Sequence, residues 1–423
     1  MIAVLSGQSD FFGWLETKRI SFEEDDQSVK EILAAVRLEG DEAVRSYVRK
    51  FDGIELEHFS VSQQEMDEAE KGLDPDIRER LLLSYANILE YHQKQKQNHW
   101  FYEKPGQLLG QLVRPIEKVG LYVPGGKGIY PSSVLMTAIP AKVAGVPETY
   151  VITPCDNQGK VHPVVLAAAR ICGVTGVFKV GGAQGVAAFA YGTAQIPKVY
   201  KIVGPGNKYV TLAKKYLYGT IDIDSLAGPS EVLIIADKTT PLDYLVADFF
   251  AQAEHSEDAQ AVVLVPDQAM AQQIAQLFEE RLATSPRRAI LEKSIRSNSC
   301  IVVYRDLDEA YAIANEYAAE HLEVLSDAID FYEITANIKN AGAIFIGVET
   351  PVALGDYFAG PNHTLPTNGT AKYASPLGVY DFVKYTSILR FKKGETARVA
   401  PFAAPLAQLE GFYEHANSIL VRK

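Results

Sequence analysis

The sequence has few cysteines, and they do not form a recognisable pattern. Cys155, Cys172 and Cys300 are far apart along the 423 residues, and no Cys-x-x-Cys pair occurs. Small secreted domains rely on closely spaced cysteines for their disulfides, so this usage argues against a disulfide framework. It indicates a reducing compartment. We expect the cytoplasm, or a plastid if a transit peptide has been removed.

Long apolar runs and an excess of positive charge are also lacking. No stretch reaches the roughly 18 apolar residues that a membrane span needs, and the first residues lack the basic and apolar regions of a signal peptide. The formal net charge is −12, which disfavours a general surface for nucleic acid or anionic membranes. We therefore expect neither a nucleic-acid partner nor a membrane partner.

Most of the chain consists of short apolar runs that alternate with amphipathic stretches. Residues 27–100 are different, because they have a helical pattern throughout. From about residue 117 the runs VGLYV, TYVIT, VFKV and VYKIV predict strands, each followed by a helical stretch, and a second such series follows GPSE (228–231). Repeated strand–helix units imply parallel sheets with helices on both faces. The sequence therefore predicts an α/β fold with two tandem doubly wound domains, a helical N-terminal segment and a less regular C-terminal tail.

Three glycine-rich turns follow predicted strands of the first series. They are VPGGKGIYPSS (123–133), VGGAQG (180–185) and VGPGNKYVT (203–211). Glycine after a strand lets the backbone approach a ligand, and the N-terminus of the following helix attracts phosphate. None of the turns is a GxGxxG fingerprint or a Walker loop. A single turn is weak evidence, because α/β proteins need such glycines anyway, but three in one sheet favour a nucleotide-like ligand.

The stretch from residue 347, GVETPVALGDYFAGPNHTLPTNGT, has no sustained apolar period. Its density of glycine and proline predicts a succession of specific turns instead of a helix. Ordered irregular loops of this length are uncommon and usually functional. The loop carries Asp356 and His363, a carboxylate and an imidazole that could bind a metal or a substrate.

Two further pairs of polar residues stand at predicted helix ends. Gln252 and His255, in QAEH, share a helical face and could ligate zinc, although His255 could equally complement the helix dipole. Glu320 and His321, in AAEH, could form an acid/base pair, or could only cap a helix. Cys155 could be a thiol nucleophile, but no histidine lies within six residues of it, and plain packing is favoured.

Eight motifs, in their order and spacing, resemble those of histidinol dehydrogenase from about residue 20 to the end of the chain. They are VGLYVPGG, GGAQG, GPGNKYV, AGPSEV, QAEH, AAEHLE, GDYFAGPNHTLPT and LEGFYEHANS. The resemblance implies an NAD-dependent, zinc-containing homodimer with an incomplete Rossmann-like fold. It also implies the last two steps of histidine biosynthesis, in which L-histidinol is oxidised through L-histidinaldehyde to L-histidine.

The resemblance further implies a role for individual residues. One zinc ion per subunit would be held by Gln252, His255, Asp356 and His415, the last from the partner subunit. Glu320 and His321 would be the catalytic pair. The NAD contacts, one in each glycine-rich turn, would be Tyr122, Gln184 and Asn207. The substrate contacts would be Ser230, Gln252, His255, His321, Asp356, His363, Glu410 and His415.

A discontinuous division of the chain is implied as well. We expect an N-terminal arm (1–20), a first α/β domain with the zinc and catalytic residues (21–118 and 232–370) and a second with the NAD-binding turns (119–231). The tail (371–423) would pack on the partner in an intertwined homodimer. Two alternatives stay open. One is a sister NAD-dependent dehydrogenase acting on another amino- or sulfonate-bearing alcohol, and the other is a non-enzymatic zinc-binding or scaffold protein.

Overall fold

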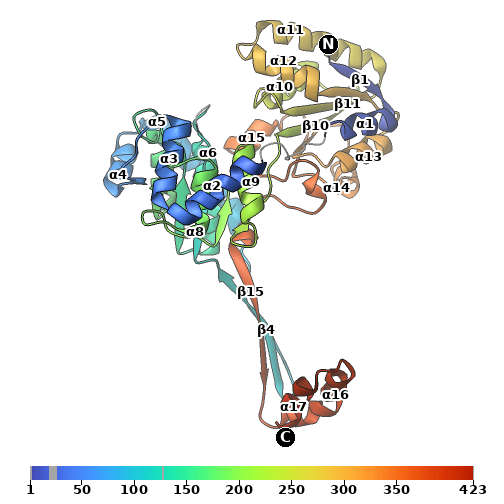
Figure 1. Ribbon diagram of the computed structural model, residues 1–423. Coiled ribbons are helices and arrows are strands. Elements are labelled where there is room, and N and C mark those ends of the chain that lie inside the picture. The colour runs from blue at the N-terminus through green and yellow to red at the C-terminus, as the bar shows by residue number, and fades with distance from the viewer. Residues whose placement is uncertain (1, 19–25, 126–127, 423) are drawn as a thin grey trace.

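The computed structural model describes residues 2–18, 26–125 and 128–422, and within these ranges a pair of six-stranded sheets forms two α/β units (Figure 1). The predicted α/β fold class is thereby confirmed. A separate three-stranded sheet extends away from the units and carries the C-terminal helices at its far end. None of the helices within the described ranges combines the length and apolar character that crossing a membrane requires.

The first sheet is parallel throughout its described strands and is buried on both faces. Its strands, in spatial order, are β1 (Ala3–Ser6), β12 (Cys300–Val303), β11 (Gln260–Val265), β10 (Glu231–Ala236), β13 (His321–Leu325) and β14 (Ala343–Ile346). Successive residues of a strand face opposite sides. Val232 and Ile234 therefore pack under one helical layer, whereas Leu233 and Ile235 pack under the other. The first layer comprises α10 (Leu242–Ala253), α11 (Gln268–Thr284) and α12 (Arg288–Asn298), and the second α1 (Gly7–Glu16), α13 (Leu307–Tyr317) and α14 (Phe331–Asn337).

The second sheet is parallel except for its first edge strand. Its strands, in spatial order, are β2 (Ser60–Val61), β7 (Gly176–Phe178), β6 (Glu148–Ile152), β5 (Lys118–Tyr122), β8 (Lys201–Val203) and β9 (Asp222–Ile223). The chain-order reversal between β5 and β8 is the kind of switch point at which α/β proteins bind ligands. One face is covered by α6 (Pro131–Ala144) and α7 (Pro163–Cys172), and the other by α8 (Gly182–Tyr191) and α9 (Lys208–Leu217).

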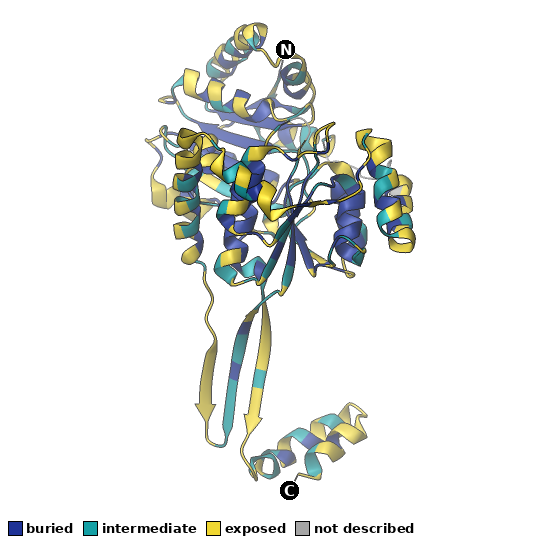
Figure 2. Cartoon of the chain, turned by 90° about the vertical axis from the view of Figure 1, so that its left-hand side faces the viewer, coloured by how far each residue is buried: buried dark blue, intermediate teal, exposed yellow. Residues whose placement is uncertain are grey.

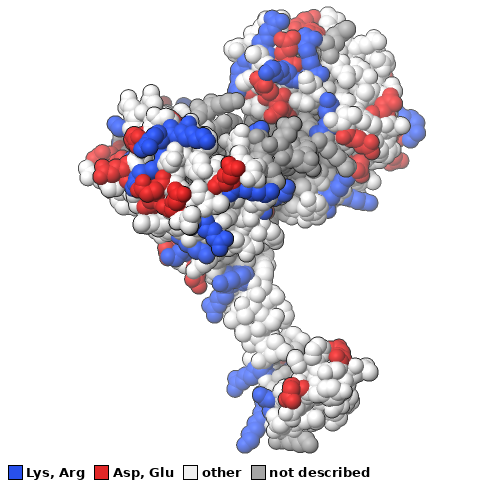
Figure 3. Space-filling view, in the orientation of Figure 1, with Lys and Arg blue, Asp and Glu red and all other residues white. Residues whose placement is uncertain are grey.

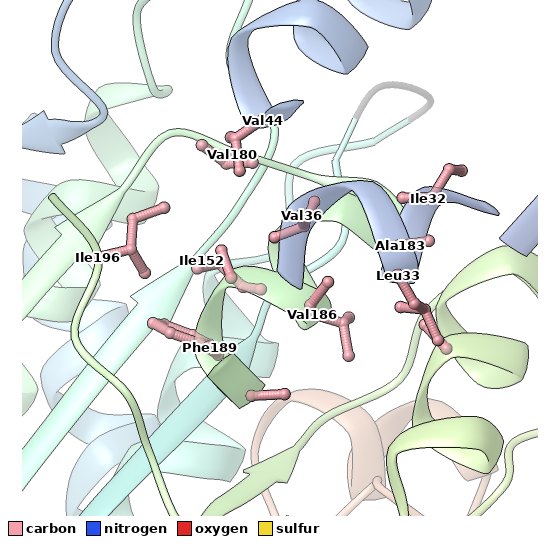
Figure 4. Close-up of a cluster of buried hydrophobic side chains, with 14 of the residues drawn as sticks. Ile32, Leu33, Val36, Val44, Ile152, Val180, Ala183, Val186, Phe189 and Ile196 are labelled. Carbon is pink, nitrogen blue, oxygen red and sulfur yellow. The ribbon is translucent and has the colours of Figure 1, made fainter. Parts of the chain in front are cut away.

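The helices between residues 26 and 93 also pack on the second sheet, which corrects the expected grouping of residues 21–118 with 232–370. These helices are α2 (Asp26–Glu39), α3 (Asp41–Asp52), α4 (Gln63–Lys71) and α5 (Pro75–Gln93). Figure 4 shows Ile32, Leu33 and Val36 packed around Val186 and its neighbours in one apolar cluster. The physical reason is that the apolar faces of α2 and α3 complete the layer that α8 and α9 begin.

The N-terminal residues do not form a separate arm, which is a second correction. Strand β1 pairs with β12 in the register Ala3↔Cys300, and Phe11 of α1 is fully buried in the core of the first sheet. Residues 1, 19 and 20 of the expected arm lie outside the described residues. The two units are therefore built around residues 3–16 with 231–346, and around residues 26–93 with 118–223.

The C-terminal tail is more regular than its sequence suggests. Strand β15 (Val383–Phe391) pairs antiparallel with β4 (Gln107–Pro115), which also pairs with β3 (Trp100–Lys104), and the helices α16 (Glu395–Leu409) and α17 (Tyr413–Leu420) follow. Strands β3, β4 and β15 together form a stalk, and Figure 2 shows its outer strands, β3 and β15, largely exposed. Figure 3 shows few charged side chains along the middle of the stalk. Large apolar side chains are exposed on the stalk and its helices, including Trp100, Leu389, Phe402 and Leu409. Several large exposed apolar side chains on one part of a protein are typical of an interaction site.

Phe189→Ala tests the packing of the second unit. Phe189 is fully buried on α8, and its ring lies against Gly120 in the central strand β5, where an added Cβ would come within 2.6 Å of it. Truncation should lower the free energy of unfolding by about 3–5 kcal/mol in urea denaturation followed by circular dichroism. Leu38→Ala, at a side chain that is 85% exposed, is the control and should change it by less than about 0.5 kcal/mol. Equal effects of the two variants would contradict the packing described.

Candidate active site

A cavity of about 730 Å³ lies where turns at the carboxyl edge of the second sheet meet the amino ends of β10 and β13 in the first sheet. Its volume is in the range of small-molecule and cofactor sites. It also borders the segment that follows β14. The residues of the sequence-predicted site that line it are Asn207, Ser230, His255, Glu320, His321, Asp356 and His363.

Glu320 and His321 are held by the backbone of a single residue on the neighbouring strand. Helix α13 ends at Ala318, which adopts the left-handed conformation (φ 54°) and turns the chain directly into β13. Because β13 pairs with β10 in the register His321↔Val232, both side chains lie beside Glu231. The N–H of Glu231 donates to Oε2 of Glu320 at 2.9 Å, and its carbonyl accepts from Nδ1 of His321 at 3.0 Å. The predicted helix-to-strand junction is confirmed.

His321 is oriented as a neutral base. A backbone carbonyl can only accept a hydrogen bond, so Nδ1 carries the proton and Nε2 keeps its lone pair. Nε2 is buried and has no hydrogen-bond partner among the described residues. Burial lowers the pKa of His321 to about 4, although the charge of Asp356 acts in the opposite direction. The imidazole is thus uncharged at neutral pH and has a free acceptor atom beside the cavity.

Glu320 is a buried carboxyl group whose proton affinity is strongly raised. Burial raises its pKa well above the usual range, and the nearby carboxylates of Glu231 and Asp356 add to this, while the N–H of Glu231 opposes it. Its Oε2 lies 3.6 Å from Nδ1 of His321. Adjacent residues diverge on a regular helix, but at this junction the two side chains stay together. Two groups with proton affinities shifted in opposite directions are an arrangement suited to general acid/base chemistry.

Gln252 and His255 lie at the end of α10, as predicted. Nδ1 of His255 faces the carbonyls of Ala251 and Gln252 at 3.0 and 3.2 Å, so its proton is on Nδ1 and Nε2 is available to a ligand. Gln252 is 2% exposed, and its Nε2 has no partner among the residues that the structure describes. A buried amide with an unsatisfied end is costly unless a further group binds there.

Asp356 lies on a short helix, α15 (Val352–Tyr357), where the sequence predicts irregular loop. This is a correction, and its reason is tertiary. Val352 at the start of the helix is buried, and its N–H donates to Oε1 of Glu323 at 3.0 Å, which anchors the first turn. His363 follows in irregular backbone, with Nδ1 3.9 Å from Oδ1 of Asp356, and burial lowers its pKa. The predicted carboxylate and imidazole therefore lie together at the cavity.

The three residues that the resemblance implies as NAD contacts differ in their access to the cavity. Asn207 lines it and is the N-cap of α9, where its Oδ1 accepts from the N–H groups of Tyr209 and Val210, both at 3.1 Å. Tyr122 and Gln184 are almost fully buried and do not line it. The hydroxyl of Tyr122 accepts from the N–H of Gly182 at 3.1 Å, so it shapes the turn before α8. All three remain predictions, and residues 126–127 of the first turn lie outside the described residues.

Comparison with known proteins places this arrangement in a family. The family model of histidinol dehydrogenase matches residues 15–423. A histidinol dehydrogenase of Chlorobaculum tepidum is 48% identical over 407 residues, which cover 96% of this chain and 95% of that protein. One of Aquifex aeolicus is 47% identical over 403 residues, covering 95% and 93%. The chain belongs to the histidinol dehydrogenase family.

Solved structures agree. The crystal structure of histidinol dehydrogenase from Elizabethkingia anophelis matches with a TM-score of 0.93 at 32% identity, over 100% of this chain and 98% of that one. Betaine aldehyde dehydrogenase from Staphylococcus aureus matches with a TM-score of 0.50 at 13% identity, over 90% and 88%, which shows a common fold alone. The predicted resemblance is confirmed, and the protein is an enzyme, an oxidoreductase of a family of NAD-dependent dehydrogenases. The non-enzymatic alternative is therefore set aside.

Two residues that the histidinol dehydrogenase resemblance assigns to the site are remote from it in this chain. Glu410 follows α16 and His415 lies on α17, at the far end of the stalk, and neither lines the cavity (Figure 1). Within the described ranges there is also no group of three or more His, Cys, Asp or Glu residues that could hold a metal. A single chain therefore does not bring all four predicted zinc ligands together.

The residues that are near one another nevertheless fit a zinc ion. His255 offers a free imidazole Nε2, Asp356 a carboxylate and Gln252 a buried amide with an unsatisfied end, whose O and N can exchange by a flip. Imidazole nitrogen and carboxylate oxygen are usual zinc ligands, whereas an amide is less usual. The hydrogen bonds from His255 to backbone carbonyls are the outer contacts that typically orient such a ligand.

The surroundings of Cys155 do not favour a role as a nucleophile. Its thiol approaches the carbonyl of Lys179 at 3.6 Å, and burial raises its pKa to about 11. A reactive cysteine needs a lowered pKa, so the packing interpretation is favoured. Glu231, in contrast, was assigned no role from the sequence, although its backbone holds both members of the predicted catalytic pair. Its sequence signal is its place in the motif AGPSEV, directly after the GPS turn.

His255→Asn tests the metal site. Asparagine removes the imidazole Nε2 but leaves the helix end intact, so the purified protein should lose most of its bound zinc, roughly tenfold or more relative to the unmodified chain. Zinc content is measured by mass spectrometry of the metal after dialysis against a weak chelator. His58→Asn, at an exposed position remote from the cavity, is the control and should keep its zinc. Unchanged zinc in His255→Asn would refute the assignment.

Proposed function

We propose that this enzyme oxidises L-histidinol through L-histidinaldehyde to L-histidine, consuming two NAD per turnover in the last two steps of histidine biosynthesis. The observation that carries the proposal is the neutral, oriented imidazole of His321 beside the carboxyl group of Glu320 in a cavity between the two α/β units. Family membership supports the substrate. The alternative substrate class, another amino- or sulfonate-bearing alcohol, is distinguished by assaying NADH formation with a panel of alcohols.

The stoichiometry of the reaction defines what the protein must do. Converting R–CH₂OH and water with two NAD⁺ into R–COO⁻ and two NADH releases three protons, so bases must accept them in turn. His321 Nε2 accepts the hydroxyl proton during the first oxidation. Glu320 accepts a proton from the water that attacks the aldehyde, while His321 returns its proton to the former carbonyl oxygen. His321 is thereby free to serve again as base for the resulting hydrate. When bound, NAD accepts a hydride in each oxidation, and zinc orients the imidazole and amine of the substrate.

The remaining predicted residues bind and position the substrate and the metal. Gln252, His255 and Asp356 would hold the zinc ion from one subunit, with His415 supplied by the other. Ser230 and His363 line the cavity close to the catalytic pair, where they would contact the substrate. Glu410, at the end of α16, would contact the substrate from the partner subunit. Such positioning raises the rate by holding the reacting carbon next to the base.

We propose that the active form is a homodimer in which the stalk of each subunit reaches the cavity of the other. Three features support this: the exposed apolar side chains of the stalk, the remote position of Glu410 and His415, and the incomplete ligand set among the described residues of one chain. Exchange of an identical element between two copies satisfies all of them at once.

The NAD contacts that we propose are Tyr122, Gln184 and Asn207. The proposed location of the enzyme is the cytoplasm.

His321→Asn tests the catalytic assignment. The Asn side chain can still donate to the carbonyl of Glu231 but cannot act as a base, so kcat with histidinol should fall by about 10²–10⁴-fold. Zinc content should stay within about twofold, because His321 is not proposed as a ligand of the metal. The affinity for histidinol, measured by calorimetry, should change far less than kcat, because His321 is only one of several proposed substrate contacts. A variant with normal turnover would reject His321 as the base.

Co-expression of two inactive variants tests the shared site. His321→Asn is defective in its own cavity, and His415→Asn is defective in the stalk that it lends to its partner. A heterodimer of the two then contains one intact site, so co-expressed and separately tagged chains should recover about one quarter of wild-type turnover at random pairing. Each variant expressed alone should stay inactive. No recovery in purified heterodimers would show that the stalk completes its own subunit's site instead.

A further inference from the structure

The side chain of Glu231 is a buried carboxyl group that the mechanism above does not use. It is 2% exposed, and its Oε1 accepts from the N–H of Asn368 at 3.0 Å. Its Oε2 is buried without a hydrogen-bond partner among the residues that the structure describes. A carboxyl group with an unsatisfied oxygen destabilises a folded protein relative to an amide or an apolar side chain of the same shape. A structural role alone therefore does not account for a glutamate here.

Glu231 is directly connected to Glu320. The N–H of Glu231 donates to Oε2 of Glu320, and burial raises the pKa of Glu231 to about 8, with the N–H groups of Asn368 and Glu320 acting in the opposite direction. The charge of Glu231 in turn raises the pKa of Glu320. The charges of these two buried carboxyl groups repel each other, so a proton added to one favours release from the other.

A second cavity, of about 360 Å³, lies beside Glu231. Its lining is polar and includes Gln260 and Tyr317, whose hydroxyl donates to Oε1 of Gln260 at 3.1 Å. A polar cavity of this size can hold several water molecules. The charged residues that face it from the surrounding elements are Lys18, Glu316 and Lys372.

The second cavity adjoins the first, since Lys18 and Gln260 line both, and it reaches the surface beside another pair of residues. Lys372 and Glu316 form an ion pair of 2.7 Å at its rim, and their side chains are 35% and 45% exposed. Glu320 and His321 line the first cavity only. Glu231 is therefore the carboxyl group that lies between the buried acid of the active site and a second, solvent-accessible space.

We propose that the carboxyl group of Glu231 relays protons from Glu320 to the second cavity. Glu320, protonated by the attacking water, passes its proton to the Glu231 carboxylate, and Glu231 passes it to water in the second cavity, which restores both groups. No electrons move in these transfers. The inference rests on the proposed function, because three protons must leave for each substrate oxidised while cofactor and substrate fill the first cavity. Glu231 is a positioning and relay residue, since its side chain does not reach the substrate.

Glu231→Gln separates the relay from a structural role. Glutamine keeps the shape, an acceptor for the N–H of Asn368 and the backbone contacts to Glu320 and His321, but cannot carry a proton. We expect kcat to fall on the order of tenfold or more and the solvent deuterium isotope effect on kcat to increase. The wild-type kcat should rise as pH increases through about 8, because the relay accepts protons only when Glu231 is ionised, and the variant should lack this rise.

Asp381→Asn is the control. Burial also raises the pKa of Asp381, to about 6, and its Oδ2 accepts a backbone N–H, that of Gly378 at 2.7 Å, but it lines neither cavity. Its pH profile and isotope effect should match the wild type. A wild-type kcat, pH profile and isotope effect in Glu231→Gln would overturn the relay.

Glu231→Ala provides a second test that does not depend on the glutamine variant. Removal of the carboxyl group should lower kcat, and formate or acetate should restore it several-fold by entering the second cavity, whereas chloride at equal ionic strength should not. Equal effects of the three anions would overturn the relay. Failure of the proposed function is distinguishable, because then the wild type itself would form no NADH from histidinol, whereas failure of the relay leaves wild-type turnover and the inactive His321→Asn variant unchanged.

Discussion

The parallel pairing of β10 with β13 is the constraint on which the rest of the site depends. Its register sets Glu231 beside the junction of Glu320 and His321, and one peptide segment then fixes a carboxyl oxygen through its N–H and an imidazole through its carbonyl. A shift by one residue would turn every side chain of β13 to the opposite face. Strong burial of both strands on both faces prevents such a shift, because it would also displace Val232, Ile234 and their neighbours from the core.

Burial is the common cause of the unusual acid/base properties around this pairing. It lowers the pKa of His321 and raises those of Glu320 and Glu231, in each case because the charged form loses its hydration. The same low-polarity surroundings that stabilise the fold therefore keep the imidazole neutral and raise the proton affinity of the carboxyl groups, which strengthens them as bases when they are ionised. Location of the site at the amino ends of the first sheet contributes, since these ends are covered by the second unit.

The stalk places a different demand on the molecule. It extends exposed apolar side chains and two predicted site residues away from both units, which costs an isolated chain stability and leaves the predicted set of zinc ligands incomplete. A symmetrical partner would bury that surface and complete both sites with the same contacts. In the proposed dimer, each active site would therefore form only when the two subunits assemble.

The sequence alone predicted many of the strands and helices and several of the residues that line the cavity. Strands such as VGLYV and helices such as the one ending in QAEH follow from local apolar patterns, because burial of a strand or of one helix face is visible in a few consecutive residues. The eight collinear motifs also indicated the family, and the resemblance to that family implied Gln252, His255 and Asp356 as zinc ligands. The apolar patterns are local signals, whereas the connection between the distant motifs came from the resemblance.

Only the tertiary structure decided what lies next to what. An amphipathic helix does not specify which sheet it will cover, so the packing of residues 26–93 on the second sheet could not be read from their pattern. Helix α15 forms because Glu323 and the core hold its first turn, and its own sequence predicts a loop. Glu231 becomes significant through hydrogen bonds to residues about ninety positions away. Such contacts depend on strand pairing, and pairing depends on the packing of the whole sheet.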